Sequence, residues 1–296
     1  MNHKMKFFIT DVFGQRKYSG NQLATFLSFT PLSDKEMQRI AREVNYSETT
    51  FIMSDKPRNG GFDVRIFTPG GEVDFAGHPT LGTAFLIRKL FSEKETREVT
   101  LNLKVGQVPV SFQEDATGND LLWMKQIEPT FGKEFDEDRL ARVIGLHKED
   151  MDTGWPIQAV STGLPHIIVP LKTLEALKRV SVLKDEYDKL IDSTEAKIIL
   201  VFSPEGYTDQ HNLSVRVFPI YYGISEDPAT GSGNGCLAGY LVKHRYWGSE
   251  SIDIKTGQGH EIYRPSLIYL RAKEQEGHIE ISVGGRVISI AEGWWD

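Results

Sequence analysis

Short runs of β-branched and aromatic residues recur along the whole chain and predict many short strands. In the first half they occupy residues 6–13, 22–29, 48–53, 62–69 and 98–112. In the second half they occupy residues 166–171, 196–202, 214–220, 267–272, 278–283 and 286–293. Segments with helical spacing are few, and strands and helices do not alternate over long stretches. This pattern favours an α+β fold built mainly on antiparallel sheet.

Three segments carry helix signals. In residues 32–44, Ser33 and Glu36 form a capping box, and an apolar stripe follows at Met37, Ile40, Ala41 and Val44. The other two helices each follow a glycine-containing turn and read "GHPTLGTAFLIRK" from Gly77 and "GSGNGCLAGYLVK" from Gly231. We therefore expect two apolar helices that start in the same way, one in each half of the chain.

The two halves repeat one order of elements, which indicates an internal duplication. The run Val64-Arg65-Ile66-Phe67 matches Val215-Arg216-Val217-Phe218, 151 positions later. Gly77-His78 matches Gly231-Ser232, 154 positions later, so the second half has three added residues in the intervening loop. We expect two similar lobes, residues 1–125 and 126–296, with the crossing near residues 125–135. Their helix starts would face a shared cleft, and the final strand is free to pack back on the first lobe.

Composition and charge narrow the class of protein. The chain has 296 residues, of which 40% are hydrophobic and 25% charged, as in ordinary globular proteins. Its net charge of −7 argues against nucleic acid or an anionic membrane as the main partner, but a local positive site could still hold a small anion. No run approaches the roughly 18 apolar residues of a membrane span, and the N-terminus lacks the apolar core of a signal peptide. We therefore expect a cytoplasmic protein.

The sequence gives little indication of a metal site or a disulfide. Cys236 is the single cysteine, which excludes an intrachain disulfide and a thiolate zinc cluster. The eight histidines show no metal-ligand spacing, and the His-Glu pair in "GHEIY" has no second histidine four residues on. We expect no bound metal.

The two glycine-rich helix starts are candidate anion sites. A helix start offers free N–H donors and a partial positive charge. Glycines let a ligand approach the backbone closely there, at Gly77, Gly231, Gly233 and Gly235. Two such starts in one cleft could hold a carboxylate and stabilise an enolate as it forms. The alternative is ordinary turn chemistry, with Ser232 or Asp227 as a helix cap.

Glu48 is the carboxylate with the strongest claim to chemistry. It stands in "SETTFIM", where a polar segment enters an apolar strand. Burial there would be costly and would raise its pKa toward the range of a general base near neutrality. The alternative is an edge-strand glutamate that faces water. The 151-residue offset puts Ile199 at the equivalent place, so the second half would supply no matching acid.

Five stretches together resemble the PhzF family of phenazine-biosynthesis-like isomerases. They are "DVFGQRKYSGNQLATFL", "SETTF", "GEVDFAGHPTLGTA", "EDPATGSGNGCLAGYL" and "GQGHEIYRPS". The family is similar in fold to diaminopimelate epimerase. The resemblance therefore implies two lobes, each a mostly antiparallel barrel-like sheet around a central helix, with the active site between them. It also implies a homodimer and a cofactor-free isomerisation of a dihydro-hydroxyanthranilate.

The resemblance also implies roles for seven residues. Glu48 would move a proton between ring carbons, with support from His78, Asp227 and Ser232. The backbone amides of three glycines would hold the carboxylate of a small anionic substrate: Gly77, Gly231 and Gly233.

The related epimerases use two cysteine thiols, each just before the glycine of a helix start. Here Ala76 and Thr230 occupy those places, which excludes a two-thiol racemase. Cys236 lies six residues beyond Thr230 and is expected to be a small core residue.

Two other functions stay open on the sequence. One is a racemase or epimerase that uses Glu48 with another base, such as His78. The other is a non-catalytic protein that binds a small anion. Proton–deuterium exchange on a bound carboxylic acid would separate both enzymes from the binding protein.

Overall fold

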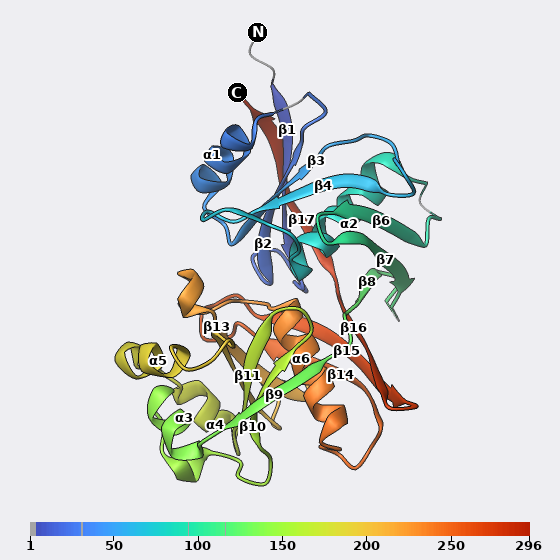
Figure 1. Ribbon diagram of the computed structural model, residues 1–296. Helices are drawn as coiled ribbons and strands as arrows, with labels where there is room; N and C mark the ends of the chain where they lie inside the picture. The colour runs from blue at the N-terminus through green and yellow to red at the C-terminus, as the bar shows by residue number, and fades with distance from the viewer. Residues whose placement is uncertain (1–3, 31, 94, 116) are drawn as a thin grey trace. The chain divides into compact units, whose positions relative to one another are not determined.

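The computed structural model describes residues 4–30, 32–93, 95–115 and 117–296, and the chain divides into two compact units. Unit 1 comprises Met1–Lys125 together with Gly284–Asp296, and unit 2 comprises Gln126–Val283. The chain thus leaves unit 1 once and returns to it for its last strand, drawn in red beside the blue first strand in Figure 1. In the described part of the chain, no helix has the length and apolarity to cross a membrane.

The sheet of unit 1 is built from short strands. Their bounds are β1 (Met5–Val12), β2 (Asn21–Leu27), β3 (Glu48–Ile52), β4 (Phe62–Phe67), β5 (Glu72–Val73), β6 (Glu98–Leu103), β7 (Gly106–Glu114), β8 (Asp120–Lys125) and β17 (Val287–Trp295). Strand β1 pairs antiparallel with both β17 and β2. Strand β3 lies between β2 and β4, and β6 follows β4 in parallel register.

The sheet of unit 2 has the same construction. Its strands are β9 (Thr130–Phe135), β10 (Ile157–Ser161), β11 (Pro165–Pro170), β12 (Ile198–Ser203), β13 (Leu213–Phe218), β14 (Ser251–Gln258), β15 (Ser266–Gln275) and β16 (His278–Gly285). From β10 to β15 successive pairs are antiparallel, parallel, antiparallel, parallel and antiparallel. The series β1, β2, β3, β4, β6 and β7 of unit 1 follows the same order. The expected duplication into two similar α+β lobes, mostly antiparallel, is confirmed.

Each sheet packs on one apolar central helix (Figure 1). Helix α2 (Gly77–Phe91) contacts strands β1, β2, β3, β6, β7 and β8 of its own unit, and most of its residues are buried. Helix α6 (Gly231–Lys243) contacts β10, β11, β14 and β15, and nearly all of its residues are buried. A helix that is apolar on every side is stable in water only when it is enclosed in this way.

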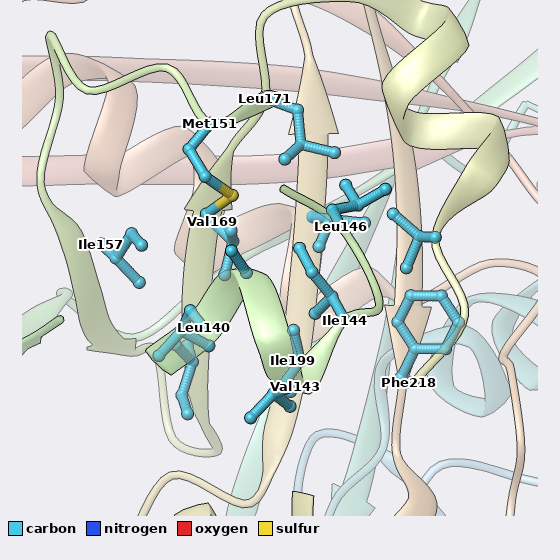
Figure 2. Close-up of a cluster of buried hydrophobic side chains, with 14 of the residues drawn as sticks. Leu140, Val143, Ile144, Leu146, Met151, Ile157, Val169, Leu171, Ile199 and Phe218 are labelled. Atoms are coloured by element: carbon cyan, nitrogen blue, oxygen red, sulfur yellow. The ribbon is translucent and has the colours of Figure 1, made fainter. Parts of the chain in front are cut away.

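Further helices cover the outer faces of the sheets. On unit 1, α1 (Asp34–Val44) has the predicted Ser33–Glu36 capping box and buries Met37 and Ala41 against the sheet. On unit 2, the outer layer consists of α3 (Glu137–Val143), η1 (Lys148–Asp150), α4 (Leu174–Arg179) and α5 (Lys184–Ile191). Figure 2 shows this core, in which Leu140 and Val143 of α3 lie with Ile199 and Phe218 of the sheet.

Helices α1, α2 and α6 lie where the helix signals of the sequence predict them, whereas other elements carry no such signal. The missed segments are β5, β8, β9, β10 and β14 with the short helices of the outer layer of unit 2. The short helix η2 (Ile220–Tyr222) lies in the longer loop of unit 2, where the offset between the two halves changes by three residues. That loop leads from β13 toward the start of α6.

Candidate active site

Glu48 is the first residue of β3, an internal strand of unit 1. Its neighbour in β2 is Leu23, and its side chain is 18% exposed. Because β3 pairs on both sides, the alternative of an edge-strand glutamate facing water is wrong. The side chain stands at the start of the strand and is mostly enclosed, and its Oε2 atom is buried.

His78 faces Glu48 from the start of the central helix. It is the second residue of α2 and is buried, and its Nε2 atom lies 3.4 Å from Glu48 Oε2. Burial lowers the pKa of His78 to about 3, although a hydrogen bond to the backbone of Gln22 acts in the opposite direction. The imidazole is therefore neutral near pH 7, and its contact with Glu48 is not an ion pair.

The hydrogen bond to Gln22 fixes which nitrogen of His78 carries the proton. A backbone partner that raises the pKa of an imidazole is a carbonyl oxygen that accepts from the ring. Within the described residues Nε2 makes no hydrogen bond, so the donor is Nδ1–H. Nε2 then presents a lone pair toward Glu48. A hydrogen bond between Nε2 and Oε2 requires one more proton, carried by the carboxyl group.

Helix α2 begins without a capping side chain. Its N-cap is Ala76, which has no side chain that could accept a hydrogen bond from the first turn. The Thr80 hydroxyl donates to the Ala76 carbonyl oxygen at 2.8 Å, and Pro79 has no N–H group to satisfy. No side chain of the N-cap therefore competes for the N–H groups of Gly77 and His78, as an anion site requires.

Asp227 and Ser232 stand at the corresponding end of α6 in unit 2. Asp227 is buried, its N–H donates to the Val217 carbonyl oxygen at 3.0 Å, and its carboxylate accepts from the Thr230 hydroxyl. Ser232 is the second residue of α6 and is half-buried. The N-cap is Thr230, and no side chain caps the helix. The alternative in which Ser232 or Asp227 serves as the cap is therefore wrong.

A duplicated ion pair anchors the segment before each central helix. In unit 1, Arg65 Nε donates to Glu72 Oε1 at 2.7 Å and Arg65 Nη2 to Glu72 Oε2 at 2.8 Å. In unit 2, Arg216 and Glu226 form the same two bonds at 3.0 and 2.8 Å. Each glutamate precedes the first glycine of its helix by five residues. The paired guanidinium and carboxylate hold both helix starts in the same way.

The strand registers identify which residues of the two units are equivalent. Phe67 of β4 pairs with Thr49, and the matching Phe218 of β13 pairs with Ile199. The equivalent of Glu48 is therefore Ile198, one residue before the expected Ile199, and it is also apolar. Ile66 pairs with Val73 in the first unit, and Val217 with Asp227 in the second. Glu48 and Asp227 thus occupy different positions of the repeated fold, and their equivalents in the other unit are the apolar residues Ile198 and Val73.

Cys236 is buried inside α6 as a free thiol, as the sequence analysis expected. Its Sγ atom lies 3.6 Å from Thr162 Oγ1 and 3.6 Å from His166 Nδ1. Burial raises the pKa of the thiol to about 11, so it stays protonated near neutrality. Neither Cys236 nor the residues before the helix glycines, Ala76 and Thr230, can serve as a thiolate base.

Comparison with known proteins decides the family. A family model described as "Phenazine biosynthesis-like protein" (PhzC-PhzF) matches residues 10–293. The chain belongs to the PhzC-PhzF family.

Residues 4–30, 32–93, 95–115 and 117–296 contain no group of three or more His, Cys, Asp or Glu side chains that could hold a metal ion.

Relatives that are named as isomerases match over nearly their whole length. The trans-2,3-dihydro-3-hydroxyanthranilate isomerase of Pseudomonas aeruginosa is 33% identical over 291 residues, covering 97% of this chain and 98% of that protein. An uncharacterized isomerase of Clostridium acetobutylicum is 30% identical over 296 residues, covering 98% and 97%. The expectation of an isomerase of this family is confirmed.

Solved structures confirm the fold class. The Bacillus anthracis phenazine biosynthesis protein of the PhzF family has a TM-score of 0.91 and 27% identity, with 99% of each chain covered. A probable proline racemase from Agrobacterium radiobacter has a TM-score of 0.63 at 10% identity, covering 99% of this chain and 93% of that one. This more distant likeness concerns the fold alone. The PhzC-PhzF chain shares its two-lobed, diaminopimelate epimerase-like fold with such racemases.

Proposed function

We propose that the protein is a cofactor-independent isomerase that moves a proton on a small cyclic or unsaturated carboxylate, with Glu48 as the only base. The observation that carries this proposal is the pairing of Glu48 Oε2 with the neutral imidazole of His78, 3.4 Å away. The substrate named for the Pseudomonas aeruginosa relative, trans-2,3-dihydro-3-hydroxyanthranilate, belongs to the same chemical class.

In the proposed reaction Glu48 removes a proton from one carbon of the substrate and returns it to another. The electron pair of the broken C–H bond moves into the conjugated system, and the carboxylate becomes a carboxylic acid. Nε2 of His78 can accept a hydrogen bond from that acid and hold the proton, which exchanges with solvent in part of the turnovers before a hydrogen returns to carbon. Atoms and charge balance with no oxidant, metal or cofactor, because reactant and product are isomers.

The helix starts would hold the charges of the substrate. The amides of Gly77, Gly231 and Gly233 are proposed to bind its carboxylate and to stabilise the negative charge that develops on proton removal. Asp227 and Ser232 are proposed to contact its polar groups. The missing caps on α2 and α6 support this role, because no side chain competes for the first-turn amides.

The position of His78 argues against a racemase that uses Glu48 and His78 as its two bases. Such an enzyme places its bases on opposite faces of one carbon atom. Glu48 Oε2 and His78 Nε2 are only 3.4 Å apart, so a carbon cannot stand between them. The two groups act together on one side of the substrate.

Deuterium exchange tests the proposed function. The protein would be incubated in D₂O with trans-2,3-dihydro-3-hydroxyanthranilate and with other small unsaturated carboxylates, and the C–H signals followed by NMR. We expect isomerisation with deuterium incorporation for at least one carboxylate and none for the matching amide. Binding with neither isomerisation nor exchange for every carboxylate would favour a non-catalytic anion-binding protein.

We further propose a homodimer with no nucleic-acid or membrane partner. Analytical ultracentrifugation would then give twice the 33.4 kDa mass of the chain. A sedimenting mass of one chain at micromolar concentration would contradict the dimer and leave the proposed chemistry untouched.

A further inference from the structure

A buried network of polar side chains lies behind Asp227 in unit 2. Gln258 at the end of β14 is fully buried and makes four hydrogen bonds. Its Nε2 donates to the Asp227 carbonyl oxygen at 2.8 Å and to Thr230 Oγ1 at 3.0 Å. Its Oε1 accepts from the Thr230 N–H at 3.2 Å and from Asn234 Nδ2 at 2.9 Å. These four bonds use the full capacity of a glutamine amide.

Asn234 extends the network into the first turns of α6. It is fully buried, and its Nδ2 also donates to the Thr230 carbonyl oxygen at 3.0 Å. Its Oδ1 accepts from the Thr256 hydroxyl at 2.7 Å. The amide groups of Asn234 and Gln258 therefore hold both the N–H and the C=O of Thr230, the N-cap of α6.

The network also fixes the direction of the Thr230 hydroxyl. Oγ1 accepts an N–H from Gln258, so the single hydrogen of the hydroxyl is free to go to the Asp227 carboxylate beside it. A hydroxyl that donates to a carboxylate stabilises its ionised form and holds its orientation. Every bond from Thr256 to Asp227 thus has a defined donor and acceptor.

Unit 1 provides an internal comparison, because four of the five equivalent positions there are apolar. Phe62 pairs with Leu101, and the matching Leu213 pairs with Thr256, which makes Leu101 the equivalent of Thr256. Two residues on, Leu103 is the equivalent of Gln258. Val73 is the equivalent of Asp227, Ala76 of Thr230 and Thr80 of Asn234.

The fold therefore does not need the amide of Gln258 or the hydroxyls of Thr256 and Thr230, although Thr80 of unit 1 keeps a bond to the N-cap carbonyl oxygen. Leu101 and Leu103 are buried in unit 1, where they fill the corresponding places beside a central helix of the same type. Buried amides are costly unless every bond is made, and apolar residues of similar size avoid that cost. The polar set occurs in the unit that carries Asp227, which points to a role in holding that side chain.

We propose that Gln258, Asn234 and Thr230 are positioning residues that keep the Asp227 carboxylate ionised and in one orientation. This proposal rests on the proposed function, in which Asp227 contacts the substrate. Thr230 acts directly on the carboxylate, and the two buried amides act through Thr230. A displaced carboxylate would lose alignment in the transition state more than it would lose ground-state binding.

Matched substitutions at Thr230 test the proposal. Thr230→Val removes the hydroxyl and keeps the shape, whereas Thr230→Ser keeps the hydroxyl. In crystal structures of the two variants we expect the Asp227 carboxylate in its original conformer for Thr230→Ser and in another or mixed conformer for Thr230→Val. One unchanged conformer in both variants would overturn the positioning role, and this readout needs no substrate.

Turnover of trans-2,3-dihydro-3-hydroxyanthranilate gives the second readout. We expect Thr230→Val to lower kcat about 10–100-fold while KM changes less than about threefold, and Thr230→Ser to restore kcat. Tyr240→Phe is the control, since it removes another buried hydroxyl bond of α6, from Tyr240 to the Pro156 carbonyl oxygen. It should lower Tm by a few degrees and leave kcat unchanged.

Two further variants separate a structural from a functional role. The combined Thr230→Ala, Asn234→Thr, Thr256→Leu and Gln258→Leu variant copies the residues of unit 1 and should fold with low activity. Full activity in that folded variant would overturn the proposal. Asp227→Asn tests the proposed function by itself. Full activity of this variant would show that the Asp227 carboxylate is not needed in the site. Low activity in Asp227→Asn with full activity in Thr230→Val would reject only the positioning role.

Discussion

Nε2 of His78 and Oε2 of Glu48 lie 3.4 Å apart within one unit of the protein, and the imidazole is neutral because burial lowers its pKa to about 3. Since the ring proton is on Nδ1, toward the Gln22 backbone, the atom that faces the carboxyl group is an acceptor. The arrangement suits a base that must hold a proton briefly and release it. A charged histidine in that place would instead keep the carboxylate ionised and reduce its basicity.

Replacement of His78 should impair turnover less than replacement of the base. In His78→Ala the carboxyl group loses the acceptor for its proton but keeps its place at the start of β3. We expect turnover to fall about tenfold, within the usual range for loss of a supporting polar group. Single-turnover exchange with the substrate carboxylate measures it. A loss as large as that of Glu48→Gln would show that His78 is itself the proton carrier.

Acid should destabilise both units through their buried histidines. The pKa of His78 lies at about 3 and that of His166 at about 4, both below the unfolded value of 6.5 and both because of burial. Between pH 6.5 and these values the unfolded chain binds more protons, so the free energy of unfolding falls as the pH falls. At pH 5 the cost is roughly 2 kcal/mol for each histidine.

His166→Leu is the matched variant for that prediction, since unit 1 has Leu23 at the equivalent register position. Urea unfolding of unit 2 at pH 7 and pH 5, followed by hydrogen exchange of its strands, should show a smaller loss in the variant than in the wild type. An equal loss in both proteins would mean that His166 does not contribute to the acid sensitivity.

We expect Cys236 to take no part in the catalysed reaction. The thiol is buried, with a pKa raised to about 11, and lies in the interior of α6. Cys236→Ser should keep turnover within about twofold, and the native protein should resist iodoacetamide at pH 8. The measurement combines a turnover assay with mass spectrometry of the alkylated protein. Loss of turnover in Cys236→Ser would show that the Cys236 thiol takes part in the reaction.

Carboxylate capture by the helix starts should appear in ligand stabilisation. A charged carboxylate gains from the first-turn amides and the helix dipole, whereas a neutral amide gains much less. Benzoate and anthranilate should raise Tm more than benzamide and anthranilamide at equal concentration, with the difference reduced at high salt. Equal shifts for acids and amides would contradict anion binding at the helix starts.

Much of the fold was predictable because the two halves of the chain repeat the same order of sequence patterns. The repeated Val-Arg-Ile-Phe and Val-Arg-Val-Phe runs and the two glycine-rich turns predicted the duplication, α2 and α6. The helices α3, α4 and α5 were missed because they are six to eight residues long and are stabilised by packing on the sheet. Strand β14 was missed because its sequence, "SIDIKTGQ", alternates weakly.

The candidate site was predictable only in part. Glu48 and His78 were named separately, but nothing in the sequence gives their 3.4 Å separation, which depends on the packing of α2 beside β3. Gln258 and Asn234 were overlooked although both lie in stretches that carried the family resemblance. Their role depends on bonds between residues 24 positions apart, which a local pattern cannot reveal.

The most direct test of the central claim is proton–deuterium exchange by Glu48→Gln on the carboxylate that the wild type turns over. Gln keeps the shape but cannot accept the proton, and Glu43→Gln, on the exposed side of α1, is the control. If Glu48 is the only base, exchange falls at least about 10²-fold, ligand affinity stays within about tenfold, and the control keeps full activity. Wild-type exchange in Glu48→Gln would contradict the assignment of the base.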